Sequence, residues 1–226
     1  FEVEGSFRTP YAQTITVAKS GGDFTTINAA YTYAMTLTPS ATNQILIKVM
    51  PGVYDEQLTL DTSYISLIGD SKDTTKITNG SATYAVVYNS SAIAGVSVRN
   101  MTIDSSSSAN AVRVTNSSSD IWFEHNNIIN SAAYSIAIAS TAGGTFKYNY
   151  IAGANCGACT ISGGVWENNE FHNRHTNTNP GLASVSGGTF RNNYIHEATN
   201  TIYGGNFEGN YFAGGIGTSS SGSAYF

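Results

Sequence analysis

One phrase recurs through the second half of this 226-residue chain: two glycines, any residue, an aromatic residue, two residues, asparagine, one residue, and isoleucine or phenylalanine. The asparagine positions, with Met101 in the first, are 25, 23, 20, 24 and 17 residues apart. A fixed phrase at such uneven spacing predicts a solenoid whose turns carry loops of different lengths. Four full copies begin at Gly143, Gly163, Gly187 and Gly204, and two degenerate copies surround Val98 and Phe123.

Each position of the phrase predicts a column of side chains stacked along the solenoid. The aromatic and aliphatic columns belong in the core, because one turn can bury its apolar face only against the next. The asparagines belong inside as well, where amides about 4.8 Å apart can bond to one another and to the backbone of the bends. Turn propensity would explain one such asparagine, but not a whole column. The column is Asn126, Asn149, Asn169, Asn193 and Asn210.

The residue after the aromatic alternates in charge from turn to turn. On stacked strands opposite charges stabilise, whereas like charges cost about 0.2–1 kcal/mol. A slip by one turn would place like charges together, so this column indicates a device that fixes the register. Its members are Arg99, Glu124, Lys147, Glu167, Arg191 and Glu208.

A capping helix is predicted near the N-terminus, over about residues 25–36. Thr25 or Thr26 can cap it, and apolar residues from Ile27 onward keep helical spacing. An open solenoid end must be covered, and we interpret the helix as that cover.

We therefore expect a single all-β domain, a parallel β-helix. The expected boundaries are a lead-in segment over 1–14, the β-helix over 15–213 and a Gly/Ser-rich tail over 214–226. No amphipathic helix follows Phe212, so we expect the last turn to be covered by the tail or by self-association.

The composition limits the classes of partner that we expect for this protein. A net charge of −5 argues against nucleic acid, and no apolar run is long enough to insert into a membrane. No motif calls for a cofactor or a metal. Four Asn-x-Ser/Thr sequons permit glycosylation, which suits an extracellular protein.

Residues 15–78 resemble the start of pectin methylesterases and related pectin-lyase-like proteins. This resemblance covers about the first third of the chain and implies a right-handed β-helix with three strands per turn. Adhesins and phage tail proteins share the signature, and resemblance to phage spikes implies trimers. The matched segments are Val17–Lys19, Gly22–Ile27, Ile47–Val49, Pro51–Tyr54, Leu67–Asp70 and Thr75–Thr78.

The resemblance also implies which residues a methylesterase would need: two aspartates, a glutamine and an arginine on the outer face of one sheet. The first acidic motif falls on Ser131–Ile136 and the second on Ala154–Thr160, where Cys156 replaces the nucleophilic aspartate. Asn110 takes the glutamine position, and the arginine motif is absent. Without a paired acid and base we expect no methylesterase activity and assign no catalytic residue. The predicted outward residues of this sheet are Arg113, Ala137, Ala158 or Thr160, Ser184 and Thr201.

The pair Cys156 and Cys159 spells a CxxC motif. Residues three apart on a strand point to opposite faces, and a zinc site needs four ligands. We expect core or loop cysteines, with a local disulfide as the main alternative and a redox or metal role as the least favoured.

A candidate contact surface lies near the loop 171–180. Glu170 and His172 are predicted to face outward, with His196 beside His172 and three tyrosines in the column of Glu170. Exposed tyrosines flanked by histidine and glutamate can bind sugar rings or a protein partner. We favour the interpretation that the tyrosines cover the sheet or pack on a neighbouring subunit and that the histidines are solvated, with subunit contact preferred. The candidates are Tyr150, Glu170, His172, Arg174, His175, Tyr194, His196 and Tyr211.

The sequence favours a non-enzymatic, extracellular or virion-surface structural or adhesive protein that works in an assembly. We expect self-association, as a trimer or end to end, and contact with a surface polysaccharide. The alternatives are a carbohydrate-active enzyme, such as a lyase using Arg174 as base or an esterase, and a glycan-binding module near Glu170–His175.

Overall fold

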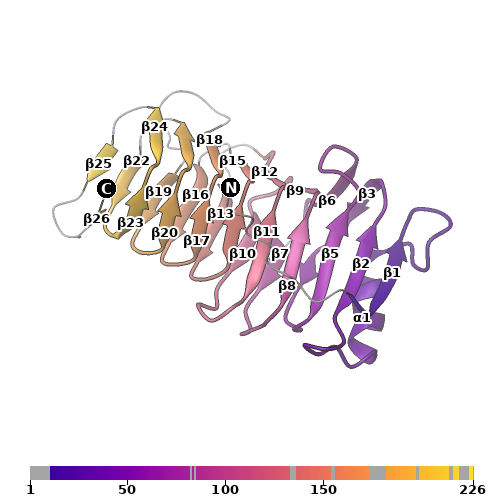
Figure 1. Ribbon diagram of the computed structural model, residues 1–226. Helices are drawn as coiled ribbons and strands as arrows, with labels where there is room; N and C mark the ends of the chain where they lie inside the picture. The colour runs from indigo at the N-terminus through magenta and orange to yellow at the C-terminus, as the bar shows by residue number, and fades with distance from the viewer. Residues whose placement is uncertain are drawn as a thin grey trace, which may run out of the picture.

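The computed structural model describes residues 11–81, 83, 85–132, 136–153, 156–173, 182–196, 199–213, 216–218 and 224–225. These residues form an elongated stack of strands, with the N-terminal turns at one end and the C-terminal turns at the other (Figure 1). Every pairing between named strands is parallel and joins one turn to the next.

Three sheets of 10, 8 and 8 strands run along the stack, and we call them sheets 1, 2 and 3. Sheet 1 comprises β1 (Gln13–Val17), β2 (Ile45–Val49), β5 (Ile65–Gly69), β8 (Val96–Arg99), β11 (Ile121–Glu124), β14 (Thr145–Lys147), β17 (Val165–Glu167), β20 (Thr189–Arg191), β23 (Gly205–Glu208) and β26 (Ala224–Tyr225). Sheet 2 comprises β3 (Gly52–Asp55), β6 (Thr75–Asn79), β9 (Thr102–Ser105), β12 (Asn127–Asn130), β15 (Tyr150–Gly153), β18 (Glu170–Asn173), β21 (Tyr194–His196) and β24 (Tyr211–Ala213). Sheet 3 comprises β4 (Leu58–Thr59), β7 (Ala85–Asn89), β10 (Asn110–Val114), β13 (Ile136–Thr141), β16 (Cys156–Ile161), β19 (Leu182–Val185), β22 (Thr199–Ile202) and β25 (Ile216–Thr218).

The chain visits the three sheets once per turn, as in β5, β6, β7 and then β8, β9, β10. This confirms the predicted fold class, an all-β parallel β-helix with three strands per turn and one short helix. One detail differs from expectation: strands β25 and β26 continue the pairing beyond residue 213.

Helix α1 (Ile27–Thr36) lies at the N-terminal end of the stack, where its apolar face is buried (Figure 1). Thr26 is the N-cap, and its Oγ1 accepts a bond from the backbone N–H of Ala29 at 3.3 Å. The Glu56 carboxylate also caps this end, because its two oxygens each accept a bond of 2.8 Å, from the N–H groups of Ile27 and Asn28. A distant carboxylate thus ties the helix to the first turns, which local sequence could not reveal.

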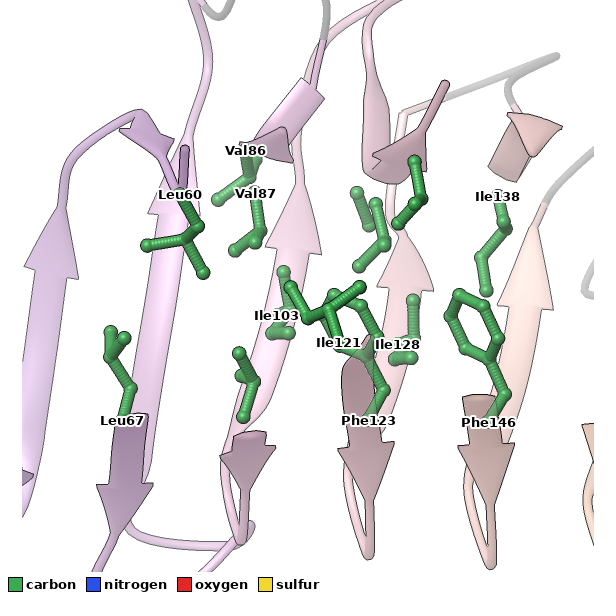
Figure 2. Close-up of a cluster of buried hydrophobic side chains, with 14 of the residues drawn as sticks. Leu60, Leu67, Val86, Val87, Ile103, Ile121, Phe123, Ile128, Ile138 and Phe146 are labelled. Atoms are coloured by element: carbon green, nitrogen blue, oxygen red, sulfur yellow. The ribbon is translucent and has the colours of Figure 1, made fainter. Parts of the chain in front are cut away.

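The core is built from side chains of all three sheets that point toward one another (Figure 2). The aromatic column is buried, and its rings are nearly parallel from turn to turn. Phe146 and Trp166 lie with ring centroids 4.1 Å apart, and Phe190 and Phe207 with centroids 4.7 Å apart. Each such stack stabilises the fold by about 0.5–1.5 kcal/mol in addition to the free energy gained by burying the rings.

The asparagine column forms a ladder inside the stack. Asn149 is typical: its Oδ1 accepts from the N–H of Asn126 at 3.0 Å, and its Nδ2 donates to the carbonyl of Phe123 at 2.8 Å. The same Nδ2 also donates to Oδ1 of Asn169 at 3.0 Å. The two backbone bonds repeat at the other four ladder residues. Each amide therefore binds the turn before it, and all but the last, Asn210, are at most 2 % exposed.

A left-handed residue precedes every ladder position. Its φ lies between 52° and 63°, and it bends the chain from sheet 1 into sheet 2. Asparagine and glycine tolerate this conformation better than other residues, whereas a tyrosine there, Tyr148, is uncommon. The bend residues are Asn100, His125, Tyr148, Asn168, Asn192 and Gly209.

The alternating charges lie in one row on sheet 1, as the register predicts. Lys147 Nζ lies 2.7 Å from a Glu167 oxygen, and Arg191 lies 3.2 Å from the other. Arg191 also reaches Glu208 at 3.3 Å. The hydrogen bond from Lys147, together with the positive charges of Lys147 and Arg191, lowers the pKa of Glu167 despite its partial burial.

Replacing Asn169 tests the ladder. Asn169→Ala removes the bonds that the N–H of Asn149 and the carbonyl of Phe146 make with this side chain, so we expect the free energy of unfolding to fall by about 2–4 kcal/mol. Asn169→Asp should lower the free energy of unfolding further, because a carboxylate oxygen would then face the two oxygens that accept from Nδ2, the Phe146 carbonyl and Oδ1 of Asn193. Urea denaturation measures both against the exposed control Asn206→Ala. Losses equal to that of the control would exclude the ladder as a source of stability.

Replacing Glu167 tests the charge row. Glu167→Gln should lower the free energy of unfolding by about 0.5–1.5 kcal/mol at pH 7, and Glu208→Gln less, because that side chain is 72 % exposed. The pKa of Glu167 is depressed in the folded state, so its contribution is present above the unfolded pKa and is lost as pH falls through the folded value. The free energies of unfolding of wild type and Glu167→Gln should therefore differ at pH 7 and converge as the pH falls through the lowered pKa of Glu167. A difference that does not change with pH would contradict this origin.

Candidate functional site

Four candidate residues form one outward row on sheet 2. Tyr150, Glu170, Tyr194 and Tyr211 are the first residues of β15, β18, β21 and β24, and they pair in register from turn to turn. Each directly follows a ladder asparagine. Because successive side chains on a strand point to opposite faces, an asparagine held inside places the next residue outside.

A second outward row lies two residues further along the same strands. His172 and His196 occupy it on adjacent turns, with their ring centroids 3.7 Å apart. Ala152 and Ala213 are their register partners on the flanking turns. The two histidines therefore stand between small neighbours in their own row.

Glu170 joins the two rows. Its Oε1 lies 2.6 Å from Nε2 of His172 and 3.3 Å from Nε2 of His196. The hydrogen bond from His172, followed by the charge of His172 and the bond from His196, lowers the pKa of Glu170 even though partial burial opposes this. The carboxylate is thus ionised at neutral pH and has both imidazoles directed at a single oxygen.

Tyrosine rings line both sides of this cluster. The ring centroids of Tyr150 and His172 are 4.9 Å apart, and those of Tyr194 and His196 are 4.3 Å apart; in both pairs the rings are tilted against each other. Tyr194 also stacks on Tyr211, with centroids 4.8 Å apart. The side chains of Tyr194 and Tyr211 are 39 % and 58 % exposed, so an apolar surface with hydroxyl tips faces solvent.

An open hollow of about 530 Å³ adjoins Tyr194 and Glu170. It combines amide, carboxylate, imidazole and phenol groups, a mixture that can both stack on a ligand and bond to it. The bend residues Asn168 and Asn192 were not among the sequence candidates. Their position directly before a ladder asparagine is the signal that could have identified them. The lining residues are Asn168, Asn169, Glu170, Asn192, Tyr194 and His196.

The structure thus brings together six of the eight sequence candidates: Tyr150, Glu170, His172, Tyr194, His196 and Tyr211. The other two, Arg174 and His175, lie outside the described residues.

The predicted outer face of sheet 3 needs correction. Ala137 and Ala158 are fully buried, whereas Thr160 and Ser184 are exposed. Thr160 and Ser184 adopt φ of 60° and 53°, which interrupts the alternation of the strand, so that Ala158 and Ile161 both point inward. Arg113 is half-buried, and the side chain of Thr201 lies outside the described residues. The described strands of sheet 3 contain neither aspartate nor glutamate.

The cysteine prediction also changes. Cys156 is buried and disulfide-bonded, so the preferred expectation of a free core or loop cysteine is wrong. The chain has one other cysteine, Cys159, whose side chain lies outside the described residues.

Solved structures of similar shape include pectin methylesterases. PemA from Erwinia chrysanthemi aligns with a TM-score of 0.58 and 17% identity over 94% of this chain and 68% of its own. A pectin methylesterase in complex with hexasaccharide VII gives 0.60 and 18% over the same shares, and the enzyme from carrot gives 0.59 and 19% over 94% and 67%. The chain shares their fold.

At this identity the likeness confirms the parallel β-helix fold and nothing further. No family model matches the sequence, and no curated protein matches it. Among the described residues, no helix has the length and apolar character required to cross a membrane.

Proposed function

We propose that this protein is a non-enzymatic, extracellular adhesive β-helix that holds a polysaccharide along sheet 2 and works in an assembly of several copies. The observation that carries the proposal is the outward row of Tyr150, Glu170, Tyr194 and Tyr211. The row runs along the stack, across the strands, so a linear polymer lying on it would meet a tyrosine on three of four successive turns.

The chemistry of the row suits sugar better than a buried protein contact. A tyrosine offers an apolar ring face and a polar tip, which match the faces and hydroxyls of a sugar ring. The centre of the row is the charged Glu170 with two imidazoles, and the hollow beside it is lined by amides. Charged groups are depleted at the centre of protein interfaces, so this face fits a hydrated ligand. One pectin methylesterase of the same fold was solved with a hexasaccharide, which supports the compatibility of the fold with such ligands.

The proposed lack of esterase activity is based on the residues of sheet 3. The resemblance places the esterase acids on the sheet that contains β13 and β16, and the described strands there supply no carboxylate. Acyl transfer from an ester needs an activated nucleophile and a base to activate it. We therefore propose that the protein binds its polysaccharide without hydrolysing esters on it.

Self-association is proposed from the C-terminal end. The strands β24, β25 and β26 are the last of their sheets, so within the described residues their outer edges face no further strand. Unpaired edges favour pairing with another chain. End-to-end contact or a trimer would cover them.

A second candidate function is a polysaccharide-cleaving enzyme. The observation that favours it is the close contact between Glu170 and His172, at 2.6 Å, because such a pair can transfer a proton.

Polysaccharide binding can be measured by calorimetry or affinity electrophoresis with pectin, alginate and neutral glucans, in buffer containing EDTA. We expect saturable binding to one of them, weakened about two- to tenfold in Tyr194→Ala, because a lost ring stack costs about 0.5–1.5 kcal/mol. The matched control is Tyr203→Ala, which removes an exposed tyrosine outside the row and should leave the affinity unchanged.

Two results would contradict the proposal. Equal losses in the two tyrosine variants would remove the row as the binding surface. Release of acid or unsaturated ends that stops in His172→Ala would show that the second candidate is correct.

Assembly is tested separately by sedimentation velocity over a range of protein concentrations. We expect a species larger than one chain, since open sheet edges favour association. A single monomeric species at every concentration would rule out self-association.

A further inference from the structure

Three side chains on two adjacent turns direct ligand atoms at one point. Glu170, His172 and His196 each place one such atom within 4.8 Å of the others. Both imidazoles approach through Nε2, and both approach the same carboxylate oxygen. Sequence reasoning expected no metal here, because no motif joins residues that meet only through the register of the strands.

We propose that Glu170, His172 and His196 bind one divalent transition-metal ion, Zn²⁺ foremost, with water in the remaining positions. This site goes beyond the proposed function and does not depend on it.

Two of the three separations between ligand atoms are close to what the ion requires, and the third, between the imidazoles, is within 4.8 Å. Zinc lies about 2.0–2.2 Å from nitrogen or carboxylate ligands in a tetrahedron, so ligand atoms around it stand about 3.3 Å apart. Oε1 of Glu170 and Nε2 of His196 are already 3.3 Å apart. The 2.6 Å contact with His172 must open by about 0.7 Å. A small rotation of Glu170 provides this, because its side chain is 49 % exposed and free to move outward.

The imidazoles are held in place by their surroundings. The strands β18 and β21 pair in register, which fixes the two backbones side by side. Tyr150 flanks one ring, Tyr194 flanks the other, and the two imidazoles stack on each other. Ligands with few alternative rotamers lose little entropy on binding, which raises affinity.

The ligand set selects the class of ion. Two imidazoles with one carboxylate suit zinc, nickel or copper, whereas calcium and magnesium prefer oxygen ligands alone. Three protein ligands with an accessible outer side leave room for water. The hollow beside Glu170 and His196 provides that side.

Calorimetric titration of Zn²⁺ into tag-free, EDTA-stripped protein tests the site. We expect one ion per chain, and an affinity at least tenfold lower in each of His172→Ala, His196→Ala and Glu170→Gln. The matched controls are His125→Asn, which keeps a residue suited to the left-handed bend, and Glu208→Gln; both should bind as wild type. Circular dichroism and Tm without metal show whether each variant is folded.

The proposal is overturned if the wild-type chain takes up no Zn²⁺, or if His172→Ala and His196→Ala bind it as tightly as wild type. Loss of binding in the folded control His125→Asn would also overturn it. Because sugar binding is measured with EDTA present, failure of either test leaves the result of the other readable.

Discussion

The hydrogen bonds of a buried amide to the turn before it are the interaction on which the rest of this structure depends. Each ladder asparagine satisfies a backbone N–H and a backbone carbonyl at the bend between sheets 1 and 2. These groups lie inside, away from water, where an unpaired donor or acceptor is costly. The ladder therefore fixes the register of successive turns as well as stabilising each bend. The charge row on sheet 1 reinforces that register from the outside.

The arrangement of the candidate residues on the surface follows from the orientation of the buried asparagines. An asparagine pointing inward at each bend makes the next residue point outward, and this alone aligns Tyr150, Glu170, Tyr194 and Tyr211. Two residues later the same strands align His172 with His196. Residues about 20 positions apart in sequence thus become neighbours through the pitch of the stack. The candidate site is a property of the repeat and needs no dedicated loop to position it.

The repeat phrase is sufficient to predict the columns on sheets 1 and 2, because its positions map directly onto inward and outward side chains. It is insufficient on sheet 3, where no phrase marks the strands and left-handed residues at Thr160 and Ser184 shift which side chains are buried. Glu56 caps α1 from a distant segment of the chain, so local helix propensity could not predict this contact. The contacts between Glu170 and the two histidines depend on exact register and rotamers, which spacing alone does not provide.

The central claim is that the ladder amides are internal and bonded from turn to turn. Exchange of side-chain amide protons, followed by NMR in the native state, tests it most directly. The Nδ2 protons of Asn149, Asn169 and Asn193 should exchange far more slowly than those of the exposed Asn206. Exchange of all four at the same rate would show that the asparagines are solvated and would contradict the account.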